Sequence, residues 1–221
     1  CPGDDCGGFQ TSAGPFNFAS VSTVTFQVTV GSAPPPAPAI TKIVDSAAFN
    51  TRFAPGMPII VTGMSLANSA TDAATFTIAG KPAPILSFFS PTSVEIQIPV
   101  DAPVGSAAVV ATYKGVASTA SNITIDALAP EIFTHTDTNS PTFYDFSGQP
   151  FSFQGSRPAS ANSQVYLIAA GLGPTNPAQV TNTKTAVSSP TTMPVQLMIG
   201  NKLVTPDYAG LFIGGAPGTY K

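Results

Sequence analysis

Few residues in this chain have side chains suited to catalysis, and their spacing assembles no familiar reaction centre. The single histidine, His135, lies in Thr-His-Thr-Asp, two residues before Asp137. A His–Asp pair supplies two members of a hydrolytic triad, but no serine stands in a nucleophile-elbow pattern. We therefore interpret His135 as a polar residue of a surface loop, and we expect no enzymatic activity.

Candidate ligands for metals and phosphates are equally sparse. Zinc needs four ligands, or three and a water, and Cys1 and Cys6 have no further ligands at a suitable spacing. The acidic runs Asp4–Asp5 and Asp137–Asn139 offer too few oxygen ligands for a calcium loop. The glycines of Gly171-Leu-Gly173 lack the following Lys-Ser/Thr of a phosphate-binding loop. The sequence predicts no catalytic residue, no metal and no cofactor.

The composition favours an exported protein. The 221 residues carry a net charge of −3, only 9% are charged, and Ser, Thr, Gly and Pro are abundant. This excludes a basic surface for nucleic acid, and no apolar run reaches the roughly 18 residues of a membrane span. No signal-peptide pattern is present, so we expect a mature form at the cell surface or outside the cell. Cys1 and Cys6 enclose the turn-forming Pro-Gly-Asp-Asp and are expected to form a disulfide; two free thiols or a lipidated Cys1 are the alternatives.

Short β-rich runs separated by Gly, Pro, Asn and Ser predict an all-β fold of two tandem immunoglobulin-like sandwiches. Residues 40–127 contain seven such runs and form the first predicted sandwich. Residues 128–221 form the second, with strands at 164–169 and 195–199, a surface loop over 174–192, and turns without a strand at the end. A hairpin across Ser147–Gly148 is expected to carry five aromatic residues on its arms, namely Phe143, Tyr144, Phe146, Phe151 and Phe153.

One strand stands apart in an N-terminal extension, residues 1–39. Residues 21–30 read VSTVTFQVTV and place four apolar residues on one face, namely Val24, Phe26, Val28 and Val30. The segment GSAPPPAPA (31–39) follows, and its prolines favour a semi-rigid extended hinge. The alternative interpretation is that residues 21–30 are simply the first strand of their own first domain.

The landmarks of residues 40–221 resemble the uncharacterised Solibacter-type C-terminal domain family, an Ig-like unit of exported bacterial surface proteins. The matching segments are VDSAAF (44–49), APGMPIIVTGMSLA (54–67), IAGKPAPILSFFSPTSVEIQIP (78–99), APEIF (129–133), VYLIAAGLGPT (165–175) and VQLMIGNKLVTPDYAGL (195–211). The resemblance implies the fold and no chemistry, because the family has no established catalytic residues to carry over.

The chain departs from this family at its end. Members usually continue past Pro-Gly-x-Tyr, here Pro217–Tyr220, into a further strand, and FQVTVGSAP (26–34) resembles that strand. We therefore expect the second sandwich to lack its last strand, and residues 21–30 to be a donor strand for a neighbouring copy. This predicts a pilus-like filament of head-to-tail copies; a truncated chain is the alternative explanation.

The remaining expectations concern the surface. Phe9, Phe16 and Phe18 are expected to pack on the neighbouring subunit, since a free tail would leave them exposed. Asn122 heads the sequon Asn-Ile-Thr and is a candidate glycosylation site, and the Ser/Thr-rich loops at 135–142 and 181–192 are candidate O-glycan sites. The aromatic hairpin could also stack on sugar rings. The alternative function is therefore a non-polymerising adhesin or carbohydrate-binding module.

Overall fold

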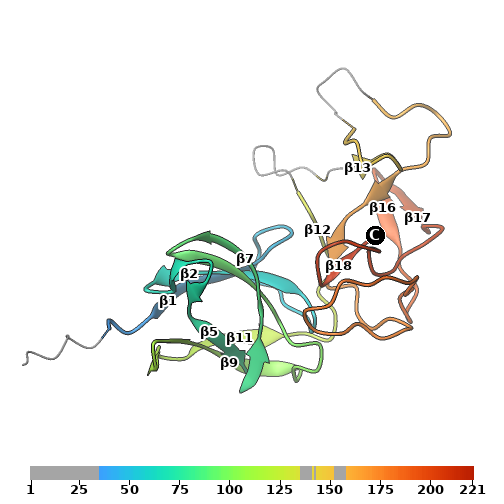
Figure 1. Cartoon of the computed structure of the whole chain (residues 1–221). Coiled ribbons are helices and arrows are strands. Elements are labelled where there is room, and N and C mark those ends of the chain that lie inside the picture. The colour runs from blue at the N-terminus through green and yellow to red at the C-terminus, as the bar shows by residue number, and fades with distance from the viewer. Residues whose placement is uncertain (1–34, 135–140, 142, 152–157) are drawn as a thin grey trace, which may run out of the picture. The chain divides into compact units, whose positions relative to one another are not determined.

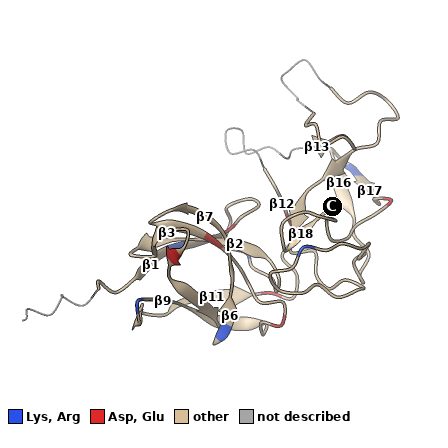
Figure 2. Ribbon diagram, in the orientation of Figure 1, with Lys and Arg blue, Asp and Glu red and all other residues tan. Residues whose placement is uncertain are grey.

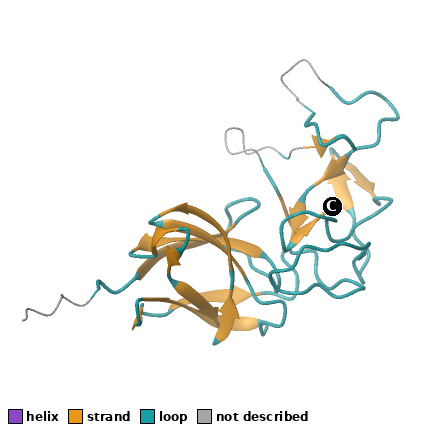
Figure 3. Cartoon of the chain, in the orientation of Figure 1, coloured by secondary structure: helices purple, strands orange, loops and turns teal. Residues whose placement is uncertain are grey.

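The computed structural model describes residues 35–134, 141, 143–151 and 158–221. These residues form strands, turns and loops and no helix, as Figure 3 shows, so the predicted all-β class is confirmed. It follows that no helix of the described residues is long and apolar enough to cross a membrane. Pro35–Lys221 form one compact unit, and residues 1–34 lie outside the described residues. We call residues 35–127 the first region and residues 128–221 the second region.

The strands of the first region form two antiparallel sheets, ordered β1-β2-β8-β7 and β10-β9-β5-β6, with β11 also paired to β9 (Figure 1). A short ladder joins β3 and β4. The strands are β1 (Ala39–Asp45), β2 (Pro58–Met64), β3 (Ala67–Ser69), β4 (Asp72–Ala73), β5 (Thr75–Ile78), β6 (Lys81–Ala83), β7 (Ile85–Ser90), β8 (Ser93–Gln97), β9 (Gly105–Tyr113), β10 (Val116–Ala117) and β11 (Ser121–Ile125). The seven runs expected from the sequence all fall on these strands.

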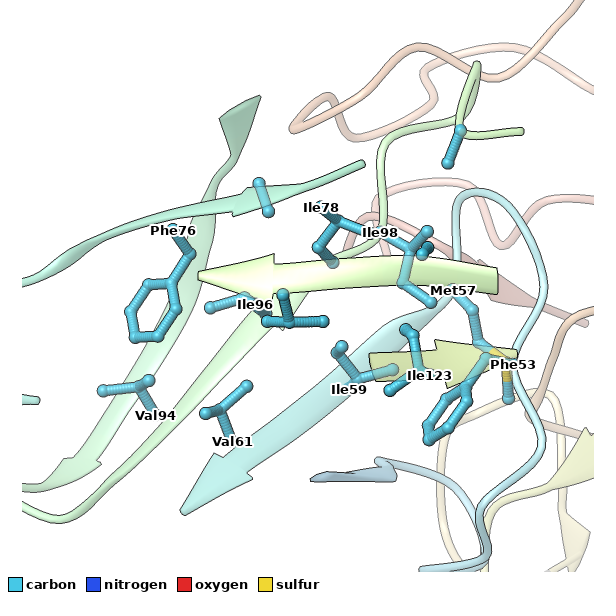
Figure 4. Close-up of a cluster of buried hydrophobic side chains, with 14 of the residues drawn as sticks. Phe53, Met57, Ile59, Val61, Phe76, Ile78, Val94, Ile96, Ile98 and Ile123 are labelled. Carbon is cyan, nitrogen blue, oxygen red and sulfur yellow. The ribbon is translucent and has the colours of Figure 1, made fainter. Parts of the chain in front are cut away.

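Alternating side chains build one hydrophobic core in this region. On β8, Val94 and Ile96 are fully buried while Glu95 between them lies on the other face, as its alternation predicts. On β9 the buried residues are likewise every second one. Figure 4 shows the core, in which Phe53, Met57, Ile59, Val61, Phe76, Ile78, Val94, Ile96, Ile98 and Ile123 gather.

The second region has shorter strands and smaller sheets. Its main sheet has the order β12-β15-β18, and two further ladders pair β13 with β14 and β16 with β17. The strands are β12 (Glu131–Ile132), β13 (Phe143–Tyr144), β14 (Tyr166–Leu167), β15 (Ala169–Ala170), β16 (Leu197–Ile199), β17 (Lys202–Val204) and β18 (Thr219–Tyr220). The expectation of turns without a strand at the end is therefore wrong, because Thr219 and Tyr220 pair with β15.

Two other predictions for the second region can be compared with the structure. The hairpin across Ser147–Gly148 is present: the Phe151 N–H donates to the Phe143 carbonyl at 2.8 Å, and Gly148 supplies the positive φ of 82° in the turn. The segment 174–192 lacks regular strands, as predicted, but parts of it are buried. Its Asn182 N–H donates to the side-chain oxygen of the buried Gln97 at 2.6 Å, which ties it to the first region.

The main sheet of the second region corresponds to β1-β2-β8 of the first in strand order, and in both a short hairpin lies between the central strand and the last strand along the chain. In both sheets, one residue of the central strand faces one residue on each side. The triplets are Ile43–Val61–Val94 and Lys42–Thr62–Ser93 on β1-β2-β8, and Ile132–Ala169–Tyr220 and Glu131–Ala170–Thr219 on β12-β15-β18.

In each sheet a glycine comes directly after the residues of the central strand that are paired on both sides: Gly63 follows Thr62, and Gly171 follows Ala170. A Cβ added to Gly63 would lie 2.0 Å from the carbonyl oxygen of Ala39, and one added to Gly171 would lie 2.0 Å from that of Ala129. Both positions therefore need glycine because another backbone approaches too closely for any side chain. This shared constraint supports the repeat independently of the pairing.

The hairpins also correspond. Each has a two-residue loop, closed by an Ile and a Lys: Ile78 and Lys81 around Ala79–Gly80 in β5–β6, and Ile199 and Lys202 around Gly200–Asn201 in β16–β17. The two hairpins differ at the outer edge of their first strand. β5 also pairs with β9, whereas β16 pairs only with β17 among the described residues.

Candidate functional site

The described residues offer no catalytic or metal-binding constellation. No group of three or more His, Cys, Asp or Glu side chains is placed to hold a metal ion among them. The fully buried carboxylate, Asp45, accepts backbone N–H groups from Ala47 at 2.9 Å, Ala48 at 2.6 Å and Asn50 at 2.5 Å. These bonds satisfy the charge and hold the turn after β1, so Asp45 has a structural role.

Charged residues are few and spread along the described chain, as the blue and red segments of Figure 2 show, and several pair with each other. Lys81 hydrogen-bonds Asp101, and this bond is the main cause that lowers the pKa of the Asp101 carboxyl. Arg52 contacts Glu131 at 3.6 Å across the two regions. The Lys81–Asp101 pair is exposed and contributes little to stability, whereas the Glu131 side chain in the second pair is largely buried.

One open groove of about 640 Å³ lies beside β5 and β6 in the first region. It is lined largely by apolar side chains, among them Phe76, Ala83 and Ile85, and the loop at Thr181–Asn182 closes one side. Its only ionisable lining residues are Lys81 and Asp101, which are paired with each other. The two ionisable groups of the groove are therefore engaged with each other.

Most of the exposed large hydrophobic residues of the described chain belong to the second region. Of the large hydrophobic residues that are exposed, four lie in the first region and eleven in the second. The eleven are Phe146, Val165, Val180, Val187, Met193, Met198, Ile199, Leu203, Val204, Tyr208 and Ile213. Contiguous apolar exposure marks an interaction surface, and four of the eleven, Met198, Ile199, Leu203 and Val204, are neighbours in the β16–β17 ladder.

The repeat shows which of these side chains would be buried in a complete sandwich. Ile78 is 0% exposed, whereas its counterpart Ile199 is 46% exposed. Ala83 is 4% exposed, whereas its counterpart Val204 is 39% exposed. In the first region, β9 and β11 bring Val109, Ala111 and Ile123 into the core, and the described second region has no strands in these positions. Among the described residues, the β16–β17 hairpin therefore lacks the covering strands that bury its counterpart β5–β6.

The small core of the second region lies on its main sheet. It contains Ala169, Leu211 and Tyr220, with Leu172 packed against them. The Tyr220 hydroxyl donates to the Gly173 carbonyl at 2.5 Å, and burial raises its pKa to about 12. This core anchors β18 but leaves the β16–β17 hairpin outside it.

A second surface feature is an aromatic cluster formed by Tyr144, Phe146, Tyr166 and Phe212. Tyr144 stacks on Tyr166 with ring centroids 5.3 Å apart, and Phe146 meets Tyr166 edge to face at 5.8 Å. The ammonium group of Lys221 lies 4.3 Å from the Phe146 ring centroid and 4.4 Å from that of Tyr166. The cluster therefore binds a cation of its own chain.

The residues predicted as sites from the sequence are placed as follows. Asn122 and Thr124 of the sequon are exposed on β11, an edge strand. Gly171 and Gly173 follow a strand and pack against residues of the chain itself, as a turn does. The remaining predicted residues lie outside the described residues and stay predictions: Cys1, Cys6, Phe9, Phe16, Phe18, Val24, Phe26, Val28, Val30, His135, Asp137 and Phe153.

Sequence reasoning missed that the β16–β17 hairpin is the counterpart of β5–β6. The available signal was the correspondence between Ile-Ala-Gly-Lys at 78–81 and Ile-Gly-Asn-Lys at 199–202, each closing a hairpin. Comparing the two halves of the chain with each other would have revealed this correspondence.

No protein-family model matches the chain, and no curated protein matches it either. Among solved structures, a gamma-CGTase from alkalophilic Bacillus clarkii aligns with 84% of this chain at 14% identity and a TM-score of 0.36. The Bacteroides ovatus mixed-linkage glucan utilization protein SGBP-B, solved with a mixed-linkage heptasaccharide, aligns with 80% at 11% identity and a TM-score of 0.30. The chain spans 26% and 44% of the lengths of these two proteins. Both similarities are distant, so the functions of these proteins are not carried over.

Proposed function

We propose that this protein is a structural subunit of an extracellular filament, in which residues 21–30 of one copy complete the second region of its neighbour. The observation that carries the proposal is the exposure of Ile199 and Val204, whose counterparts in the first region are buried. The two regions are then two tandem immunoglobulin-like sandwiches, the second of which is completed only on assembly.

The composition of residues 21–30 suits this role. A strand added to a sheet edge gains main-chain hydrogen bonds and buries every second side chain. Here those side chains are Val24, Phe26, Val28 and Val30. Burying four such groups gives a gross gain of about 6–12 kcal/mol.

The cost of association sets how much more contact is needed. Bringing two subunits together costs about 4–15 kcal/mol, so the strand alone gives a modest joint. We propose that Phe9, Phe16 and Phe18 add further apolar contact on the neighbouring subunit. The contact joins two different surfaces and does not close on itself, so repetition produces a filament.

The experiment measures the mass of the full chain by light scattering over a range of concentrations, with negative-stain microscopy of the same samples. We expect mass to rise with concentration and filaments to form. Phe26→Asp places a charge on the apolar face and should leave a monomer, whereas Val104→Asp, at an exposed residue of the first region, should assemble normally. A wild-type chain that stays monomeric at high concentration would refute the proposal.

A second candidate function is binding of a neutral sugar on the aromatic cluster. The observation that favours it is Phe146, a large apolar residue that is 62% exposed although the Lys221 ammonium lies near its ring. Titration of a panel of neutral oligosaccharides against the full chain and Phe146→Ala tests it. Saturable binding that the substitution removes would support this function, and equal heat signals from both proteins would refute it.

A further inference from the structure

We infer that the donated strand pairs with the outer edge of β16, in the position that β9 occupies beside β5. This inference rests on the proposed function and specifies its acceptor. It identifies the missing neighbour of the β16–β17 hairpin as residues 21–30 of a second copy.

The first argument is the stability of the hairpin. A two-stranded ladder is marginal in water, and a third strand or a covering layer is needed to stabilise it. β5–β6 has that third strand, since Phe76 faces Ala111 and Ile78 faces Val109 on β9. β16–β17 has no third strand among the described residues. Among the described residues, β16–β17 therefore has one neighbouring strand fewer than β5–β6.

The second argument is the direction of the main-chain groups on β16. The loop-closing pair Ile199–Lys202 is hydrogen-bonded across a two-residue loop, and pairs alternate along an antiparallel ladder. The next pair, Met198 and Leu203, therefore directs its N–H and C=O groups away from the hairpin. Leu203 corresponds to Pro82, whose missing N–H is tolerated at the outer edge of β6. Met198 corresponds to Thr77, which faces β9 in the first region, so its main-chain groups are aimed at the proposed donor.

The third argument is the match between β9 and residues 21–30. β9 buries alternate residues, namely Ala107, Val109, Ala111 and Tyr113. Residues 21–30 carry Val24, Phe26, Val28 and Val30 at the same spacing of two. In an antiparallel arrangement, two successive members of this set would face Leu197 and Ile199, as Ala111 and Val109 face Phe76 and Ile78.

Two variants separate the acceptor from the donor. Ile199→Asp places a charge on the proposed acceptor and leaves the donor intact, whereas Phe26→Asp does the reverse. Each full-length variant alone should remain a monomer. Mixed in equal amounts, they should form a 1:1 dimer that grows no further, because one intact donor meets one intact acceptor. Val104→Asp, in a side chain that is 62% exposed, is the matched control and should still assemble.

The outcomes distinguish the inference from the proposed function. If Phe26→Asp is monomeric and Ile199→Asp still forms filaments, the acceptor is elsewhere and the proposed function stands. If both variants assemble like wild type, both are refuted. If each variant is monomeric but the mixture gives no dimer, residues 21–30 or another segment fill the edge within one chain, and both are again refuted.

A third variant tests the acceptor in a second way, in case Ile199→Asp fails to assemble only because it misfolds. Met198→Pro removes one outward N–H from β16 and leaves the hydrogen bonds within the hairpin in place. We expect it to abolish assembly while the far-UV circular dichroism and melting temperature stay close to wild type. Filaments of normal length from Met198→Pro would overturn the inference.

Discussion

The repeat allows a paired prediction at Ile78 and Ile199, which hold equivalent positions in the two hairpins. Both are truncated to alanine in separate full-length variants. Ile78 is fully buried inside the subunit, whereas Ile199 is about half buried before assembly. The same chemical change should therefore act mainly on folding at residue 78 and partly on association at residue 199.

The magnitudes follow from burial. Truncating a fully buried isoleucine costs about 2–5 kcal/mol of unfolding free energy, which is the expectation for Ile78→Ala. Full burial of an isoleucine side chain gives about 1.5–3 kcal/mol, and the 46% of Ile199 that remains exposed corresponds to about 0.7–1.4 kcal/mol still to be gained on assembly. This predicts a 3- to 10-fold weaker association for Ile199→Ala, and a loss of about 0.8–1.6 kcal/mol in folding.

Two assays read the two effects separately. Denaturant unfolding of each variant in the monomeric Phe26→Asp background gives the folding term, and mass photometry of each variant with native residue 26 gives the association term. The reasoning is refuted if Ile199→Ala lowers the unfolding free energy as much as Ile78→Ala does, and leaves the association constant unchanged.

Three further predictions concern the subunit itself. Gly171→Ala should lower the melting temperature more than Gly80→Ala. Both glycines have positive φ, but only a Cβ at residue 171 would meet a backbone oxygen, that of Ala129, at 2.0 Å. Equal melting temperatures of the two variants would contradict this clash. Gln97→Ala should lower the unfolding free energy, measured by denaturant unfolding, by about 1–3 kcal/mol. The variant leaves the Asn182 N–H without its 2.6 Å hydrogen bond to the Gln97 side chain. An unchanged unfolding free energy would mean that water replaces this hydrogen bond. Burial raises the pKa of Tyr220 to about 12 in the fold, against about 10 in the unfolded chain, so its contribution to stability is complete below pH 10 and is lost as pH rises toward 12. Tyr220→Phe should therefore lose less unfolding free energy than wild type between pH 10 and pH 12. Parallel plots of unfolding free energy against pH for the two proteins would count against this assignment.

Local pattern was enough to predict most of the first region. The alternation of Val94, Glu95 and Ile96 and the turn at Ala79–Gly80 both specify their conformations within a few residues, because side-chain period and turn chemistry are local properties. The seven expected runs and the aromatic hairpin at Ser147–Gly148 follow from the same rules.

The second region depends on long-range pairing and was predicted less well. β18 is two residues long and follows a glycine-rich turn, so only its pairing with Ala169 and Ala170 reveals it. The tie between Asn182 and Gln97 joins residues 85 positions apart, and no local pattern marks it. The proposed acceptor role of β16–β17 rests on a comparison between two regions of one chain, because β5 has a third strand beside it and β16 has none among the described residues.

The most direct test of the central claim is a cryo-electron microscopy reconstruction of the assembled protein at a resolution that traces side chains. The account predicts that the strand carrying Val24, Phe26, Val28 and Val30 lies beside β16 and connects through its proline hinge to a different subunit. A strand beside β16 that connects to the same subunit, or a particle containing one chain only, would contradict it.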